Sequence, residues 1–181
     1  ATAEVFAGTT LTADGTLGFA TRIPFTATAK RMKARVYSPT AGIKVRLKVE
    51  DHTNNTISVE TEATTTAVNT WETLTFDFAT QAAGAPALDL TKTYDKATIF
   101  FNFGVGGAVA GVQTYYFDDV EMAAGGGGGG FAAITFDDAA VTYTLTGFGD
   151  VIATQVADPT GGTNQVAEVV KPVTAPLWAG V

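Results

Sequence analysis

The 181-residue chain contains no cysteine, so it forms neither disulfides nor thiolate metal sites. No apolar run approaches the roughly 20 residues that a membrane-spanning helix requires, so the sequence indicates no membrane span. Apolar patterns of helical period are also scarce, whereas threonine is abundant and 46% of the residues are hydrophobic. These features predict a globular all-β module that works outside the cell or at its surface.

Negative charge prevails overall, but the positive charge is concentrated in one stretch. The chain has 18 acidic and 11 basic residues, and its net charge of −7 argues against nucleic acid as the main partner. Eight of the 11 basic residues lie between Arg22 and Lys48, where there is no acidic residue. Any surface that binds anions is therefore expected in this stretch.

Two runs within the basic stretch alternate strictly, which is the pattern of half-buried strands. Residues 31–37 and 43–49 each place apolar side chains on one face and basic side chains on the other. The composition of residues 38–42 predicts a turn, and hence a hairpin. Its cationic face comprises Arg31, Lys33, Arg35, Lys44, Arg46 and Lys48. This face either binds an anionic polysaccharide or is solvated and balanced by Glu60, Glu62 and Asp77 on neighbouring strands, and we favour the second interpretation.

Short β-branched or aromatic runs recur along the whole chain. Residues 17–25, 57–62, 73–78, 98–103, 115–122, 134–136, 141–145, 151–156 and 165–170 are predicted as further strands. Residues 79–96 form the longest irregular stretch. About ten strands separated by turns, without a convincing helix, predict an antiparallel β-sandwich or jelly roll.

Six consecutive glycines, Gly125–Gly130, divide the chain. Glycine loses the most backbone entropy on folding and packs nothing, so this run cannot hold a strand. We therefore interpret residues 123–130 as a flexible joint between two strands. Both flanks carry an Asp pair, Asp118-Asp119 before the joint and Asp137-Asp138 after it.

The two ends of the chain resemble each other. When residues 1–9 are laid beside 173–181, Thr-Ala and Ala-Gly recur in register, Val5 stands opposite Leu177 and Phe6 opposite Trp178. Reading 131–181 and continuing from about Leu11 to Met122 gives one uninterrupted domain. We infer a single domain, 1–181, that is circularly permuted or cut from a tandem array. Residues 1–122 are then the C-terminal part of the ancestral module, and 131–181 are its N-terminal part.

A closed sandwich has one position for a strand that the chain encodes twice. We expect the N-terminal copy to fill this position and the C-terminal copy to be left with unpaired backbone groups. Donation of that copy to a neighbouring molecule would then build a filament. The alternative is that both ends pair side by side within one monomer.

Three short motifs resemble the jelly rolls of carbohydrate-binding modules, which are galactose-binding-like sandwiches. Trp71-Glu72-Thr73-Leu74-Thr75-Phe76 is similar to an internal strand of that family, Tyr116-Phe117-Asp118-Asp119-Val120 to its closing strand, and Phe136-Asp137-Asp138 to its opening strand. Opening and closing strands stand here in inverted order. The resemblance implies a non-catalytic extracellular module for polysaccharide binding or adhesion, with a structural role for Trp71. The alternative function is a self-assembling structural repeat of an extracellular filament.

The resemblance also implies a structural calcium ion near Asp118, Asp137, Gly161 and Asn164, since carboxylates and loop carbonyls supply the oxygens that Ca²⁺ needs. The other interpretation is that the aspartates are solvated strand-end residues.

Sugars stack on exposed aromatic rings while amides hold their hydroxyls, which makes Trp178, Tyr37, Tyr115 and Asn102 the candidate glycan contacts. Core packing is the alternative for each aromatic residue. The single histidine, His52, lies in a polar turn without a cysteine or serine partner, so we predict no enzyme activity.

Overall fold

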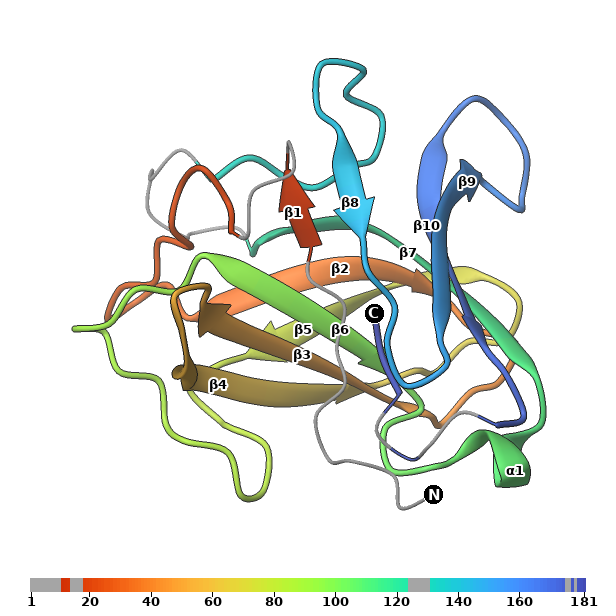
Figure 1. Ribbon diagram of the computed structural model, residues 1–181, viewed down its shortest axis with the longest axis horizontal. Coiled ribbons are helices and arrows are strands. Elements are labelled where there is room, and N and C mark those ends of the chain that lie inside the picture. The colour runs from red at the N-terminus through yellow and green to blue at the C-terminus, as the bar shows by residue number, and fades with distance from the viewer. Residues whose placement is uncertain (1–10, 14–17, 124–130, 175–176, 178) are drawn as a thin grey trace.

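The computed structural model describes residues 11–13, 18–123, 131–174, 177 and 179–181 (Figure 1). This part of the chain is all-β, with ten strands and one helical turn. The strands are β1 (Leu11–Ala13), β2 (Arg31–Tyr37), β3 (Lys44–Asp51), β4 (Asn54–Thr64), β5 (Trp71–Asp77), β6 (Lys96–Phe101), β7 (Gln113–Met122), β8 (Tyr143–Leu145), β9 (Ile152–Ala157) and β10 (Gln165–Lys171), and the helical turn is α1 (Gly107–Ala110).

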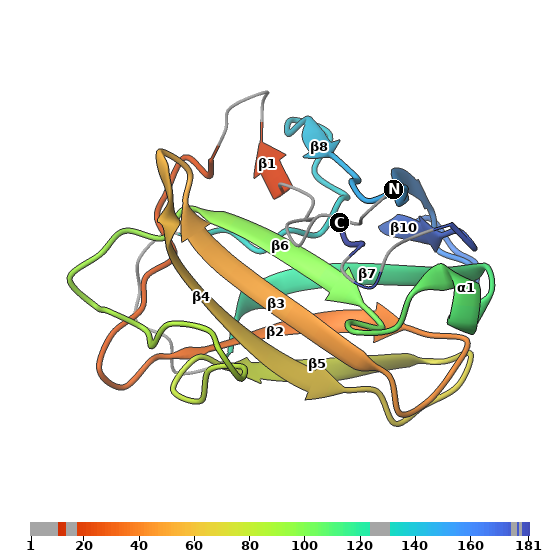
Figure 2. The same ribbon diagram turned by 60° about the horizontal axis from the view of Figure 1, so that its bottom comes forward.

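The strands form two antiparallel sheets that face each other across the core (Figure 2). One has the order β4-β3-β6-β1-β8 and the other β5-β2-β7-β10-β9. The ring of Phe101 on β6 stacks on that of Tyr115 on β7, with centroids 4.8 Å apart, so side chains of both sheets interlock. This architecture is compatible with the predicted β-sandwich.

Period-two alternation explains which faces are buried. In β2, Met32, Ala34 and Val36 are fully buried, whereas the residues between them are half-buried or exposed. β3 repeats the pattern with Val45 and Leu47 buried. The apolar side chains of each strand therefore enter the core, and the basic ones lie on the outside of the molecule.

The predicted hairpin between the two basic strands is wrong, because β2 and β3 belong to different sheets. Both strands turn their apolar faces to the same core from opposite sides. Their basic side chains consequently lie on opposite outer faces, and the six cations do not form one surface.

Acidic side chains pair with all six of these cations, from neighbouring strands in every case except Lys48, whose partner Glu50 lies on the same strand. On one sheet the pairs are Arg31–Asp77 (2.8 Å), Lys33–Glu121 (3.1 Å) and Arg35–Asp119 (3.3 Å). On the other they are Lys44–Glu62 (3.3 Å), Arg46–Glu60 (2.7 Å), Arg46–Glu62 (2.5 Å) and Lys48–Glu50. The predicted partners Asp77, Glu60 and Glu62 thus pair with Arg31, Lys44 and Arg46. Lys33, Arg35 and Lys48 are balanced instead by acids that were not predicted, which are Glu121, Asp119 and Glu50.

Glu50 is the most buried acid of these pairs, with its side chain 5% exposed between Lys48 and Lys96. Burial alone would raise the pKa of this carboxyl, but the two ammonium groups outweigh it and hold the pKa below its usual value. A lowered folded-state pKa stabilises the fold above the unfolded pKa of about 4.3, and this contribution disappears as the pH falls through the folded value.

Glu50→Gln should lower the free energy of unfolding by about 1–2 kcal/mol at pH 7, and the difference from the wild type should vanish near pH 2. Urea titrations across this pH range measure it. Glu121→Gln is the matched control, because Glu121 and its partner Lys33 are each 37% exposed, and it should cost less than about 1 kcal/mol. Equal losses in the two variants would contradict the role assigned to burial.

The prediction of a strand at 17–25 is wrong for residues 18–25, which are irregular. Phe19 and Ile23 donate their amides to Asp95 and Tyr94 at 2.5 and 2.7 Å, but Pro24 has no amide with which to continue a ladder. In the predicted strand 134–136, only Ile134 pairs, in an isolated bridge with Val120. This bridge brings together residues from the two sides of Gly125–Gly130 in the sequence.

The last residues of the chain lie beside β6, on the side away from β3. Ile99 donates to the carbonyl of Val181 (2.6 Å) and accepts from its amide (2.7 Å), which is the pattern of an antiparallel pair. Gly180 pairs with Phe148. We call this position beside Ile99–Phe101 the β6 slot. The expectation that the C-terminal copy has unpaired backbone groups is therefore wrong for Gly180 and Val181, while the N-terminal copy and Gly125–Gly130 lie outside the described residues.

β1 lies on the same side of β6 as the C-terminal residues, two residues nearer the start of β6. Leu11 stands opposite Ala97, while Val181 stands opposite Ile99. The C-terminal residues and β1 thus follow one another along a single edge of β6.

No helix within the described ranges is long and apolar enough to span a membrane.

Candidate ligand-binding face

Three aromatic side chains lie in a row on the outer face of the β5-β2-β7-β10-β9 sheet. The register pairs Tyr37 on β2 with Trp71 on β5 on one side and with Tyr116 on β7 on the other. The ring of Tyr37 meets each neighbour edge to face, with centroid distances of 5.7 Å. All three residues are half-buried. We call Tyr37, Trp71 and Tyr116 the aromatic row.

Arg35 connects the aromatic row to a pair of acids. Its guanidinium carbon lies 4.7 Å from the centre of the Trp71 ring, within range of a cation–π interaction. The same group lies 3.3 Å from Asp119 and 3.6 Å from Asp118. Asp118 is 1% exposed, and burial raises its pKa to about 6 despite the nearby Arg35. The charge of Arg35 is therefore committed to groups of the protein itself.

The loop between β9 and β10, residues 158–164, contacts this face at two points. The indole nitrogen of Trp71 donates to Asp158 at 3.1 Å, and the side-chain amide of Asn164 donates to Asp118 at 3.0 Å. One contact fixes Trp71 of the aromatic row, and the other fixes Asp118, which lies beside Arg35. The loop thereby orients the Trp71 ring and limits its rotation.

Glu168 on β10 continues the row, since the register places it opposite Tyr116. Burial, followed by the charge of Glu168, raises the pKa of the Tyr116 hydroxyl above its usual value. The hydroxyl therefore stays protonated at physiological pH. The outer face thus combines flat rings with a hydroxyl and a carboxylate at one end.

Of the predicted glycan contacts, the structure places only Tyr37 in this row. Tyr115 is fully buried against Phe101, which raises the pKa of its hydroxyl to about 12, so no face of its ring is open to a ligand. Asn102 follows β6 in the other sheet, and its carbonyl accepts from Lys171 at 3.3 Å. Trp178 lies outside the described residues.

Sequence reasoning missed Tyr116 and assigned Trp71 a structural role alone. The signal for Tyr116 was available, because Phe117 is wholly apolar and must face the core. Period two then places Tyr115 inward with Phe117 and turns Tyr116 outward. The two tyrosines are adjacent in sequence but lie on opposite faces of one strand.

The predicted calcium ligands are partly brought together. Asn164 contacts Asp118, and the backbone amide of Gln165 donates to Asp137 at 2.7 Å. The oxygens of both aspartates thus already accept from protein groups, and Arg35 supplies a positive charge beside Asp118. Gly161 donates its amide to Asp158 at 3.0 Å in the same loop. These contacts leave carboxylate oxygens able to bind a cation, and the calcium site stays a prediction.

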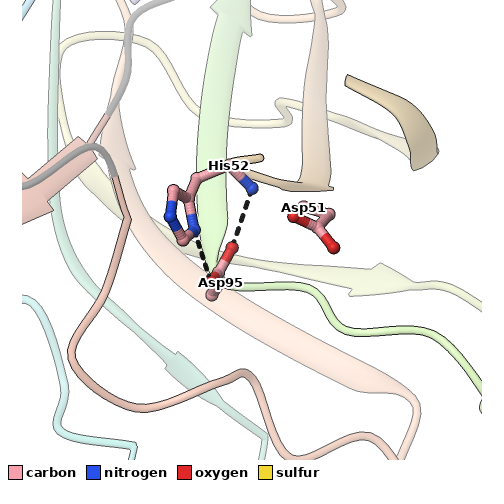
Figure 3. A group of neighbouring side chains, drawn as sticks. All are labelled: Asp51, His52 and Asp95. Atoms are coloured by element: carbon pink, nitrogen blue, oxygen red, sulfur yellow. Dashed lines mark hydrogen bonds and ion pairs between the residues drawn. The ribbon is translucent and has the colours of Figure 1, made fainter. Parts of the chain in front are cut away.

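A second group of polar side chains lies at the turn between β3 and β4 (Figure 3). Asp95 accepts from the backbone amide of His52 at 2.9 Å and lies 2.6 Å from its ring nitrogen Nδ1. Asp51 completes a group whose potential metal-ligand atoms lie within 4.8 Å of one another. The Asp51 carboxylate also accepts from the amide and hydroxyl of Thr53, at 2.8 and 2.6 Å. The two contacts with Asp95, the residue before β6, fasten the turn to the start of β6.

Asp95 is a partner of His52 that sequence reasoning did not find, because 43 residues separate them and no local pattern links them.

Comparison of the chain with protein-family models, curated proteins and solved structures finds no match. The functional assignment therefore depends on the geometry described above.

Proposed function

We propose that this protein is a non-catalytic extracellular module that binds a neutral polysaccharide through the aromatic row. The observation that carries the proposal is the side-by-side arrangement of Tyr37, Trp71 and Tyr116 on an outer sheet face. Aromatic rings accept the C–H faces of sugar rings, and polar groups at their edges accept or donate hydrogen bonds to the hydroxyls. Glu168 and the Tyr116 hydroxyl are groups of this kind.

A neutral ligand is favoured over an anionic one by the pairing of charges. The outward cations of β2 are Arg31, Lys33 and Arg35, and each lies within 3.3 Å of a carboxylate. An anionic polysaccharide would have to compete with these carboxylates and would be repelled by Glu168 nearby. A neutral glycan encounters neither obstacle.

The jelly-roll topology and its circular permutation belong to the same proposal. The Val120–Ile134 bridge supports it, because it brings together the strands that resemble the closing and opening strands of the carbohydrate-binding modules. The order of the segments beside β6 also supports the proposal. Val181, opposite Ile99, is followed along the same edge of β6 by Leu11, opposite Ala97. Joining 181 to β1 would restore an unpermuted order without moving either segment.

Tyr37→Ala should weaken binding to the preferred neutral polysaccharide at least about 10-fold, equivalent to about 1.4 kcal/mol, because the central ring contacts both neighbours. A glycan array identifies the ligand, and isothermal titration calorimetry measures the change in Kd. The affinity should change little from about 0.05 to 0.5 M salt, since no ion pair with the ligand is screened.

Phe103→Ala is the matched control. Phe103 is also a half-buried ring beneath an arginine, with the guanidinium carbon of Arg46 3.5 Å from its centre, but it borders the opposite sheet. This variant should bind within about 2-fold of the wild type. The proposal fails if Phe103→Ala weakens binding as much as Tyr37→Ala, or if only charged glycans bind.

A further inference from the structure

The β6 slot accepts only a strand with a glycine flanked by small side chains. This property of the chain is separate from the proposed glycan binding. Val181 and Ala179 are 0% and 1% exposed, so two small side chains of the slot strand enter the core. Gly180 lies between them against Phe100. A β-carbon added at Gly180 would lie 2.3 Å from Cδ1 of Phe100, closer than any real contact. The slot therefore requires glycine at this position.

The N-terminal sequence has the same residue types in the same order. When residues 1–9 are laid beside 173–181, Ala7 corresponds to Ala179, Gly8 to Gly180 and Thr9 to Val181. Threonine has nearly the shape of valine but adds a hydroxyl, which needs a hydrogen-bond partner at a position as buried as that of Val181. The N-terminal sequence thus supplies the glycine that Phe100 requires and a small residue on each side of it.

The register of β1 leads to the same correspondence independently. β1 is antiparallel to β6 with Leu11 opposite Ala97. A continuation of this ladder by two residues towards the N-terminus would put Thr9 opposite Ile99, the position that Val181 holds in the structure. Sequence similarity and strand register therefore assign Thr9 and Val181 to one place.

We propose that residues 1–9 of the chain form a second strand for the β6 slot, so that the two ends of one chain compete for a single position. With the C-terminal strand in the slot, the edge of β6 is shared by two segments. With the N-terminal strand in the slot, that edge is covered by one continuous strand that runs into β1. This exchange releases 173–181, so the occupant of the slot determines which end of the chain is available.

The N-terminal strand of the same chain is the occupant that the register favours. Only Thr10 separates Thr9 from β1, which is already in place beside Ala97. The effective concentration of a strand tethered by one residue far exceeds that of a separate molecule.

Valine substitutions in the full-length chain test the competition, because a side chain at either glycine excludes that end from the slot. Gly8→Val should leave the melting temperature within about 1 °C of the wild type. Gly180→Val should lower it by only about 2–4 °C, because the N-terminal strand takes over. The double variant should lose at least about 8 °C, far more than the sum of the single changes, since neither end fits. Additive effects would overturn the proposal.

Amide hydrogen exchange at Ile99 provides a readout that depends on the slot itself, because this amide donates to Val181. It should remain protected in each single variant and exchange at least about 10-fold faster in the double variant. Fast exchange in Gly180→Val alone would show that no second strand enters. If the double valine variant does not fold, the pair Gly8→Ala and Gly180→Ala provides the same comparison with a smaller side chain. Sedimentation velocity should show monomers throughout, and a dimer of Gly180→Val would overturn the assignment to the chain's own N-terminus.

Discussion

Replacing Phe136 with alanine is expected to lower the free energy of unfolding by about 3–5 kcal/mol, because its ring fills the centre of the core. The residue is 1% exposed. Its ring centroid lies 5.5 Å from that of Phe117 and 5.1 Å from that of Tyr143. Alanine would leave a cavity between these two rings, and the paired strands on both sides can close it only in part.

The same variant tests whether the chain is a single domain. Phe117 precedes the glycine run and Phe136 follows it, so their contact joins residues 1–122 to 131–181. Urea unfolding followed by tryptophan fluorescence and by circular dichroism should show one coincident transition in the wild type and in the variant. Phe136→Leu keeps most of the volume and should cost less than about 1.5 kcal/mol. A separate transition for either half, or a loss below about 1 kcal/mol for alanine, would contradict this account.

The strands that sequence reasoning located best are those whose alternation is strict. β2 was predicted at its observed bounds, and β3 and β4 to within a few residues, because one face of each enters the core. The pairing of Arg46 with Glu62 was also predictable, since β3 and β4 are consecutive strands joined by a tight turn. These features depend on neighbours in sequence, which a period-two pattern records.

Sheet assignment could not be obtained in the same way. β2 and β3 alternate identically whether they pair with each other or face each other across a core, because alternation records the buried face and not the hydrogen-bonded neighbour. The short predicted turn at 38–42 made a hairpin the simpler interpretation. The true neighbours of β2 are β5 and β7, which lie far along the chain.

Sequence reasoning found only part of the aromatic row, because the row also depends on which strands are neighbours. Tyr37 was recognised, whereas Tyr116 was missed although its alternation with Phe117 turns it outward. β7 departs from this alternation only further on, at the bulge opposite Lys33 and Arg35, where Asp119 has a positive φ of 48°. The contact between Trp71 and Asp158 joins residues 87 positions apart and has no local signature. A site of this kind becomes visible only when the strand order is known.

The buried lysine of β10 leads to the other large effect. Lys171 is 1% exposed, and its ammonium group lies 3.4 Å from the carbonyl oxygen of Phe101 and 3.3 Å from that of Asn102. Burial lowers the pKa of Lys171 to about 8. The unfolded chain binds this proton up to about pH 10.4, so stability rises with pH between about 8 and 10.4, and the full penalty applies below pH 8.

Lys171→Met should therefore raise the free energy of unfolding by about 2–3 kcal/mol at pH 7, because methionine fills similar space without a charge to desolvate. The gain over the wild type should shrink as the pH rises from 8 to 10, since the wild-type lysine becomes neutral in the folded state. Urea titrations at pH 7, 8, 9 and 10 measure the difference. Lys33→Met removes the same charge from a side chain that is 37% exposed, and its effect should stay within about 1 kcal/mol and vary little with pH. A Lys171→Met variant that is less stable at pH 7, or whose gain does not depend on pH, would show that the two carbonyl contacts outweigh the cost of burying the charge.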